Sequence, residues 1–403
     1  MGHLSSSFVD VGRYALDTEL DRQLKAVVAR GIPGVVALAA DRRGLFYEGA
    51  AGLRKAGEPQ SIDVDSILTL FSCTKPITAV AALQLWEDGR LDLDAPASRY
   101  APELASLQVF EGFDAAGAPR LRAPKREITT RSLLLHTAGM SYDFLNADYA
   151  RLKARLGADA GRGRKAELLL PLMFDPGEAW EYSRSMDWAG LVVEAIEGER
   201  LDAVFKRRIF APLGMGSTGF ALTASMAERR ASLHAFDAAG ALQPTDYGYV
   251  DNPEVFMGGS ALLGSASDYL RFLRMWIDGG VGENGPVLKP ETIRYAAQNH
   301  LGTLEVRPLP AVDPSRTRPF EMYPGVRKSW ALSFLRLEEP APTGRPAGSL
   351  SWAGLANLYF WIDLDNGIVG FWAAQYLPFL HEDALSGYLD FERAIYSALE
   401  GAG

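Results

Sequence analysis

The first part of the chain combines a helical pattern of apolar residues with two short apolar stretches. Residues 15–30 carry leucines and valines at helical spacing, and Gly31 follows at a position where glycine often ends a helix. Residues 34–41 and 45–52 are apolar stretches separated by a short polar turn, which is typical of two antiparallel strands. The pattern therefore predicts a helix followed by a β-hairpin.

Strand patterns return near the other end of the chain. Aromatic and β-branched residues are frequent in residues 330–338, 348–363 and 368–376, and each stretch is interpreted as one strand. Asp365-Asn366-Gly367 predicts a hairpin turn between the last two strands. Residues 382–401 have apolar positions at helical spacing and predict a terminal helix.

The middle of the chain differs from both ends, because residues 73–240 contain mainly helical segments and long loops. The simplest arrangement is an α+β fold, in which both chain ends build one antiparallel sheet flanked by the terminal helices. We expect a sheet domain of residues 1–71 and 245–403 and a mainly helical inserted domain of residues 72–244. A ligand cleft is expected between the two.

Composition narrows the range of partners. The 403 residues carry a net charge of −9, which argues against nucleic acid or an anionic membrane as a partner. Charged residues interrupt the N-terminal region before the apolar core of a secretion signal can form, and no apolar run approaches the roughly 20 residues of a membrane span. We expect a cytoplasmic protein, a monomer or small homo-oligomer, with a small-molecule partner.

Ser72 and Lys75 stand directly before a run of almost wholly apolar residues. If a helix begins at Ser72, Lys75 lies one turn later on the same face. The positive helix end and partial desolvation both favour a neutral amine, which could take a proton from the serine hydroxyl. Serine is also a preferred N-cap residue, so the spacing alone leaves capping and catalysis open.

Two distant segments could complete a site around this serine. Tyr182 lies at a loop-to-helix junction, where its phenol could act as a general base beside an ammonium group or simply be a half-buried tyrosine. Trp352 lies on an expected strand among small residues, and Gly354 permits close approach of the backbone. That strand could supply an N–H group to an oxyanion or serve only as a core strand.

Together, Ser72-Cys73-Thr74-Lys75, Tyr182-Ser183-Arg184 and Trp352-Ala353-Gly354 resemble the three ordered motifs of the serine β-lactamase and penicillin-binding-protein superfamily. The closest branch is similar to the family VIII carboxylesterases, which are class C β-lactamase-like esterases. Residues 133–140, 212–215 and 258–272 also look like segments of that family, so the resemblance covers nearly the whole chain.

The resemblance implies a β-lactamase-like fold and covalent acyl transfer without a metal or organic cofactor. It implies Ser72 as nucleophile, Tyr182 as general base and Lys75 as the group that keeps the phenol acidic. The backbone N–H groups of Ser72 and Leu355 would form the oxyanion hole, and Trp352 would line the acyl pocket. Gly354 and Arg184 are further expected substrate-binding residues.

Two departures from the β-lactamase pattern favour ester substrates. Arg184 stands where those enzymes usually carry an asparagine, and Trp352 stands where they carry the lysine that binds the penicillin carboxylate. We therefore expect a carboxylesterase for small esters with a short acyl chain. The alternatives are an acyltransferase, a β-lactamase or amide hydrolase using the same acyl-enzyme, and an inactive ligand-binding member of the fold.

The sequence offers less support for other kinds of active site. No serine lies in a Gly-x-Ser-x-Gly elbow, and the five histidines are too scattered for a short-range metal motif. We expect His136 to be structural. The single cysteine, Cys73, should point away from Lys75 and not act as the nucleophile.

Overall fold

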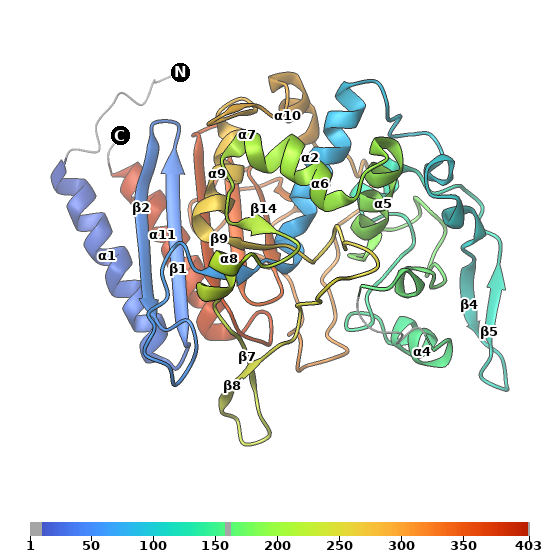
Figure 1. The fold of residues 1–403 in the computed structure, drawn as a ribbon, viewed down its shortest axis with the longest axis horizontal. Helices are drawn as coiled ribbons and strands as arrows, with labels where there is room; N and C mark the ends of the chain where they lie inside the picture. Colours follow the sequence, from blue (N-terminus) through green and yellow to red (C-terminus); the bar gives the residue numbers. More distant parts are fainter. Residues whose placement is uncertain (1–9, 158–162, 402–403) are drawn as a thin grey trace.

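The computed structural model describes residues 10–157 and 163–401, and it contains the expected antiparallel sheet made from both ends of the chain (Figure 1). Its strand order is β12-β13-β14-β15-β16-β1-β2, so strands from the C-terminal part continue directly into the N-terminal hairpin. The strands are β1 (Gly34–Asp41), β2 (Gly44–Gly52), β12 (Lys328–Ala331), β13 (Phe334–Leu337), β14 (Leu350–Gly354), β15 (Leu358–Asp363) and β16 (Ile368–Ala374).

Two of the expected strands are each divided by a tight turn, which corrects the sequence interpretation. Residues 330–338 fold into β12 and β13, with Ser333 at a positive φ of 73° between them. Residues 348–363 fold into β14 and β15, with Asn357 at φ 58° in the turn. Both segments are apolar on either side of the turn, and neither turn carries the Asn-Gly pair that marks a hairpin in sequence.

Both faces of the central strands are covered, which explains why these strands are apolar at nearly every position. On one face, Phe360 and Phe371 contact Tyr269 of α9 (Ala266–Ile277), with ring centroids 5.5 and 4.9 Å away. On the other face, the ring of Tyr359 stacks on that of Tyr388 in α11 (Glu382–Glu400), with 4.7 Å between centroids. Alternate residues thus point to opposite helical layers. In Figure 1, α11 lies beside α1 (Asp10–Ala29).

The helix that follows the nucleophile candidate lies at the centre of the remaining structure. All residues from Thr74 to Leu85 of α2 (Thr74–Glu87) are buried, as its sequence predicts, and α2 packs against α5 (Ser185–Glu197). The other helices are short: α3 (Thr130–Leu134), α4 (Ala147–Arg155), α6 (Leu201–Phe205), α7 (Ala211–Leu213), α8 (Ala224–Glu228) and α10 (Pro290–Ala296).

Small sheets lie outside the main sheet, and some of their strands fall in residues 73–240, which the sequence assigned mainly to helices and loops. One of them pairs β9 (Leu263–Ser265) with β3 (Ile67–Thr69), the strand that precedes the Ser72 turn, and with β6 (Thr218–Gly219). The others are the pairs β4 (Val109–Phe113) with β5 (Pro119–Arg122), β7 (Leu233–Phe236) with β8 (Leu242–Thr245), and β10 (Val281–Gly282) with β11 (Gly285–Pro286).

The α+β fold expected from the sequence is confirmed, with an antiparallel sheet built from both chain ends. The expected domain boundaries at residues 71/72 and 244/245 stay predictions, as do the cytoplasmic location, the small-molecule partner and the oligomeric state. Within residues 10–157 and 163–401, no helix combines the length and apolarity needed to cross a membrane.

Candidate active site

Ser72 lies in a one-turn 3₁₀ helix, Phe71–Cys73, that joins β3 to α2. Phe71 has a φ of 45°, a left-handed conformation that is costly for a large side chain and is often found at functional sites. The N-cap position of α2 is Cys73, and no side chain makes a capping hydrogen bond there. The capping interpretation of Ser72 is therefore wrong, and its hydroxyl is free to interact with Lys75.

Lys75 is fully buried and its amino group contacts three oxygens. Its Nζ lies 3.1 Å from Ser72 Oγ, 3.0 Å from the Tyr142 hydroxyl and 2.7 Å from the carbonyl oxygen of Gly259. Burial lowers the pKa of Lys75 to about 7, although the nearby Asp187 carboxylate acts in the opposite direction. A substantial fraction of the amine is therefore neutral near neutral pH and can accept a proton from Ser72.

Tyr182 lies in the segment before α5, and its side chain lies beside Ser72 and Lys75. Its pKa is raised by burial, while hydrogen bonds to Ser72 and Trp352 act to lower it. The Nζ of Lys75 lies over the phenol ring, 4.7 Å from its centroid. The resting phenol is therefore neutral, and the structure gives no sign of the acidic tyrosine that the sequence comparison implied.

The end of β14 packs directly on the Ser72 turn. A Cβ added at Gly354 would meet the carbonyl oxygen of Leu70 at 2.6 Å, so only glycine allows this approach. Ser72 and Leu355 both line the cleft at this contact. Trp352 lines it too, and its indole N–H donates to the Tyr182 hydroxyl at 2.9 Å. The tryptophan thus contacts the proton-transfer group as well as the cleft.

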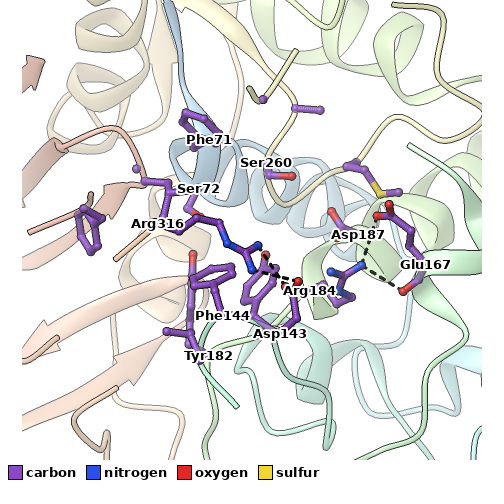
Figure 2. Close-up of a pocket in the computed structure, with 18 of the residues that line it drawn as sticks. Phe71, Ser72, Asp143, Phe144, Glu167, Tyr182, Arg184, Asp187, Ser260 and Arg316 are labelled. Atoms are coloured by element: carbon purple, nitrogen blue, oxygen red, sulfur yellow. Dashed lines mark hydrogen bonds and ion pairs between the residues drawn. The ribbon is translucent and has the colours of Figure 1, made fainter. Parts of the chain in front are cut away.

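The cleft beside Ser72 is partly open to solvent, and the space in it that the centre of a water molecule can reach is about 180 Å³. Figure 2 shows Ser72 and Tyr182 on one side and the Arg184–Glu167 pair on the other. Apolar residues dominate the walls, as is typical of sites for small molecules. The aromatic members include Phe144, Phe220, Tyr247, Phe256, Phe320 and Phe379.

Arg184 lines the cleft but does not reach Ser72. Its guanidinium donates to the backbone oxygen of Glu167 at 3.1 Å and lies 3.5 Å from that residue's carboxylate. The side chain is almost fully buried, and it also lies over the ring of Tyr142. Arg184 therefore pairs with the Glu167 carboxylate on the side of the cleft away from Ser72.

Three residues that no sequence motif identified, Tyr142, Asp187 and Gly259, define the surroundings of Lys75. Tyr142 and Gly259 accept hydrogen bonds from its amine, and the Asp187 carboxylate accepts one from the Gly259 N–H group at 2.7 Å. The only sequence indication was that Gly259 falls in residues 258–272, one of the segments resembling the family. Tyr142 has no fixed spacing from Lys75 along the chain, so the contact depends on tertiary structure.

His136 and Cys73 are both fully buried beside the site. His136 is fully buried, its pKa is well below the usual value because of burial, and its ring lies 4.7 Å from that of Tyr182. Burial raises the pKa of the Cys73 thiol, which keeps it protonated. Among the described side chains, no group of three or more His, Cys, Asp or Glu could hold a metal ion.

Two curated relatives are similar to this chain over most of its length. A lovastatin esterase of Penicillium rubens is 33% identical over 378 residues, which cover 88% of this chain and 92% of the relative. A monacolin J acid methylbutanoyltransferase of Aspergillus terreus is 33% identical over 394 residues, which cover 93% of this chain and 94% of the relative.

A solved structure is similar to this chain over most of its length. The structure of simvastatin synthase (LovD) from Aspergillus terreus superposes with a TM-score of 0.82 at 30% identity, covering 95% of this chain and 98% of the other. The model of the beta-lactamase family matches residues 20–394. By sequence and by fold, this chain belongs to the beta-lactamase family, and its relatives include an esterase and an acyltransferase.

Proposed function

We propose that this protein is a carboxylesterase that works through an acyl-enzyme on Ser72. The observation that carries the proposal is the 3.1 Å contact between Ser72 Oγ and the buried amine of Lys75 at the wall of an apolar cleft. A nucleophilic serine needs an adjacent base, and a lysine whose pKa is lowered to about 7 by burial meets that need. An inactive ligand-binding protein would have no use for this pair.

In the proposed reaction, Ser72 Oγ attacks the ester carbonyl while its proton passes to Lys75. The C–O bond to the leaving alcohol then breaks, and Tyr182 donates its hydroxyl proton to the departing alkoxide. The proton held by Lys75 restores the phenol, and water repeats the sequence to release the acid. Because the resting phenol is neutral, we assign Lys75 as the first proton acceptor and Tyr182 as the relay.

We propose binding roles for other groups in the cleft. The N–H groups of Ser72 and Leu355 are proposed to stabilise the oxyanion, since Gly354 brings the end of β14 against the Ser72 turn. Trp352 is proposed to contact a short acyl group beside Ser72 and to orient Tyr182 through its N–H group. Arg184 is proposed to keep the inner end of the cleft polar.

The cleft favours neutral esters over lactams. Trp352 occupies the position of the third motif where a carboxylate-binding lysine would be needed for penicillins, and the aromatic walls suit an apolar alcohol portion. The cleft is larger than a short acyl chain alone would fill. We therefore propose a short acyl group on an apolar alcohol, and assignment to the family VIII branch stays a prediction.

Acyl transfer to an alcohol is a second candidate function. The aromatic lining disfavours water near the acyl-enzyme, and an apolar alcohol could take its place as acceptor. Among the relatives, a methylbutanoyltransferase is as similar to this chain as an esterase is, at 33% identity in each case.

Rates on p-nitrophenyl butyrate and on a chromogenic cephalosporin, measured in parallel, test the proposed function. The ester is expected to be turned over faster, and adding an apolar alcohol should divert part of the acyl group into a new ester. Faster lactam turnover would contradict the ester assignment. A product ratio unaffected by the alcohol would exclude transfer.

The pH profile of ester turnover should follow the titration of Lys75. The active amine is neutral, and its pKa is about 7, so kcat/KM is expected to rise through about pH 7 and level off above it. The measurement uses an ester that has no ionisable group in this range. A kcat/KM that stays constant from about pH 5 to 9 would contradict Lys75 as the proton acceptor.

Gly354→Ala should weaken catalysis by moving the oxyanion site. The new Cβ would meet the Leu70 carbonyl oxygen at 2.6 Å, so backbone on one side must shift. We expect kcat to fall roughly 10- to 100-fold, with a smaller change in KM, because the displaced N–H group acts mainly in the transition state. Gly216→Ala is the matched control, since a Cβ there meets nothing within 4 Å. Equal kcat values for wild type and Gly354→Ala would contradict this role.

A further inference from the structure

Gly259 lies between a buried carboxylate and the buried amine of Lys75. Its N–H group donates to Asp187 Oδ1 at 2.7 Å, and its carbonyl oxygen accepts from Lys75 Nζ at 2.7 Å. A Cβ at Gly259 would lie 2.9 Å from Asp187 Oδ1 and 3.4 Å from Lys75 Nζ. Both groups therefore contact Gly259, Asp187 through the N–H group and Lys75 through the carbonyl oxygen.

The neighbouring residue fixes the same segment between α2 and α5. The carbonyl oxygen of Gly258 accepts a hydrogen bond from Thr78 in α2. A Cβ at Gly258 would meet the Met186 carbonyl oxygen of α5 at 2.8 Å. The segment thus has little freedom to move, and Asp187, in the first turn of α5, determines how the Gly259 peptide is held.

When the Lys75 amine is neutral, its contacts restrict the direction of its lone pair. A neutral amine has two N–H bonds and one lone pair, but Nζ has three oxygen partners. The Gly259 carbonyl can only accept, so it takes one N–H bond. If the Tyr142 oxygen takes the other, the lone pair is directed at the hydroxyl hydrogen of Ser72. This is the arrangement that proton transfer from the serine requires.

We propose that Asp187 is a positioning residue for Lys75. Its carboxylate holds the Gly259 peptide, so that Gly259 and Tyr142 take both N–H bonds of the neutral amine and leave its lone pair for Ser72. Asp187 is not expected to exchange a proton with the substrate. The inference rests on the proposed acyl-enzyme function and identifies a residue that sets the protonation and orientation of its base.

Asp187 also contributes a charge to the environment of Lys75. Its negative charge favours the ammonium form and raises the pKa of Lys75, whereas the Arg184 guanidinium lowers it. Removing the negative charge alone should therefore move the titration of Lys75 to lower pH. The other polar or titratable groups that face the amine are Ser72 and Cys73 of its own turn, Tyr142 and His136 of the segment after α3, and Tyr182.

Two substitutions separate the charge of Asp187 from its hydrogen bond. Asp187→Asn keeps an oxygen for the Gly259 N–H group and removes the charge, whereas Asp187→Ala removes both. The rate at which a serine-reactive phosphonate labels Ser72 is measured by intact mass across pH. Asp268→Asn is the matched control, because Asp268 is also buried and accepts a backbone N–H bond, from Ser217 at 2.7 Å, outside the cleft.

In Asp187→Asn, the rise of the labelling rate with pH is expected to move roughly one pH unit lower, with a plateau near that of the wild type. In Asp187→Ala the plateau should fall roughly tenfold or more, because the Gly259 carbonyl is no longer held. Asp268→Asn should reproduce the wild-type profile.

The outcomes distinguish this inference from the function on which it rests. A wild type that is not labelled at Ser72 would overturn the proposed function itself. A labelled wild type whose pH profile coincides with that of Asp187→Asn would overturn the effect of the Asp187 charge on Lys75 while leaving the function intact. Equal plateaus for the alanine and asparagine variants would overturn the role of the Gly259 hydrogen bond.

Discussion

Replacing Ser72 with alanine is expected to lower kcat/KM for p-nitrophenyl butyrate by roughly 10⁴-fold, to near the background rate. The change removes the oxygen that forms the acyl-enzyme, while Lys75 and Tyr182 remain in place and cannot substitute for it. Circular dichroism should remain unchanged, because the Ser72 side chain makes no capping bond to α2.

Cys73→Ala is the matched control for this change, since its thiol is the adjacent nucleophilic group and lies fully buried. We expect that variant to stay within a few-fold of the wild type. Substantial ester turnover by Ser72→Ala, or its loss in Cys73→Ala at unchanged stability, would contradict the assignment of the nucleophile.

Lys75→Met is expected to lower kcat/KM roughly 10³-fold and, at the same time, to leave the folded protein equally or more stable. Methionine fills the space of the lysine stem, so the variant loses the proton acceptor without opening a cavity. Burial disfavours the charged amine strongly enough to lower its pKa to about 7, so removing that amine also removes a desolvation cost. Activity and thermal unfolding are measured on the same samples.

Lys55→Met is the control for charge removal, because Lys55 forms only an exposed ion pair with Glu58. It should change neither activity nor stability appreciably. Wild-type activity in Lys75→Met would exclude the amine as the base. A large loss of stability in the same variant would mean that Lys75 holds the fold together rather than carrying the chemistry.

The sequence was sufficient to predict the sheet because its strands have distinctive local patterns. The N-terminal hairpin has a polar turn between two apolar stretches, and Asp365-Asn366-Gly367 marks the turn before β16. The turns after β12 and β14 were missed, because Ser333 and Asn357 adopt positive φ without a glycine partner. Their conformations are set by strand pairing, which no short stretch of sequence encodes.

The candidate site could be predicted as far as its residues belong to motifs. Ser72, Lys75, Tyr182, Trp352 and Leu355 were expected together, and Lys75 contacts Ser72 while the others line the cleft. The protonation states of Lys75 and Tyr182 could not be predicted, since the pKa values of both side chains depend on burial. The contacts of Lys75 with Tyr142 and Gly259 depend on how distant segments pack around α2, so no local sequence pattern predicts them.

The most direct test of the central claim is the intact mass of the protein after brief reaction with p-nitrophenyl butyrate and acid quenching, followed by peptide mapping. The account predicts a mass increase of one butyryl group, located on Ser72 and absent from Ser72→Ala. Ester turnover without any such adduct in the wild type, or an adduct on another residue, would contradict the claim that this protein acts through an acyl-enzyme on Ser72.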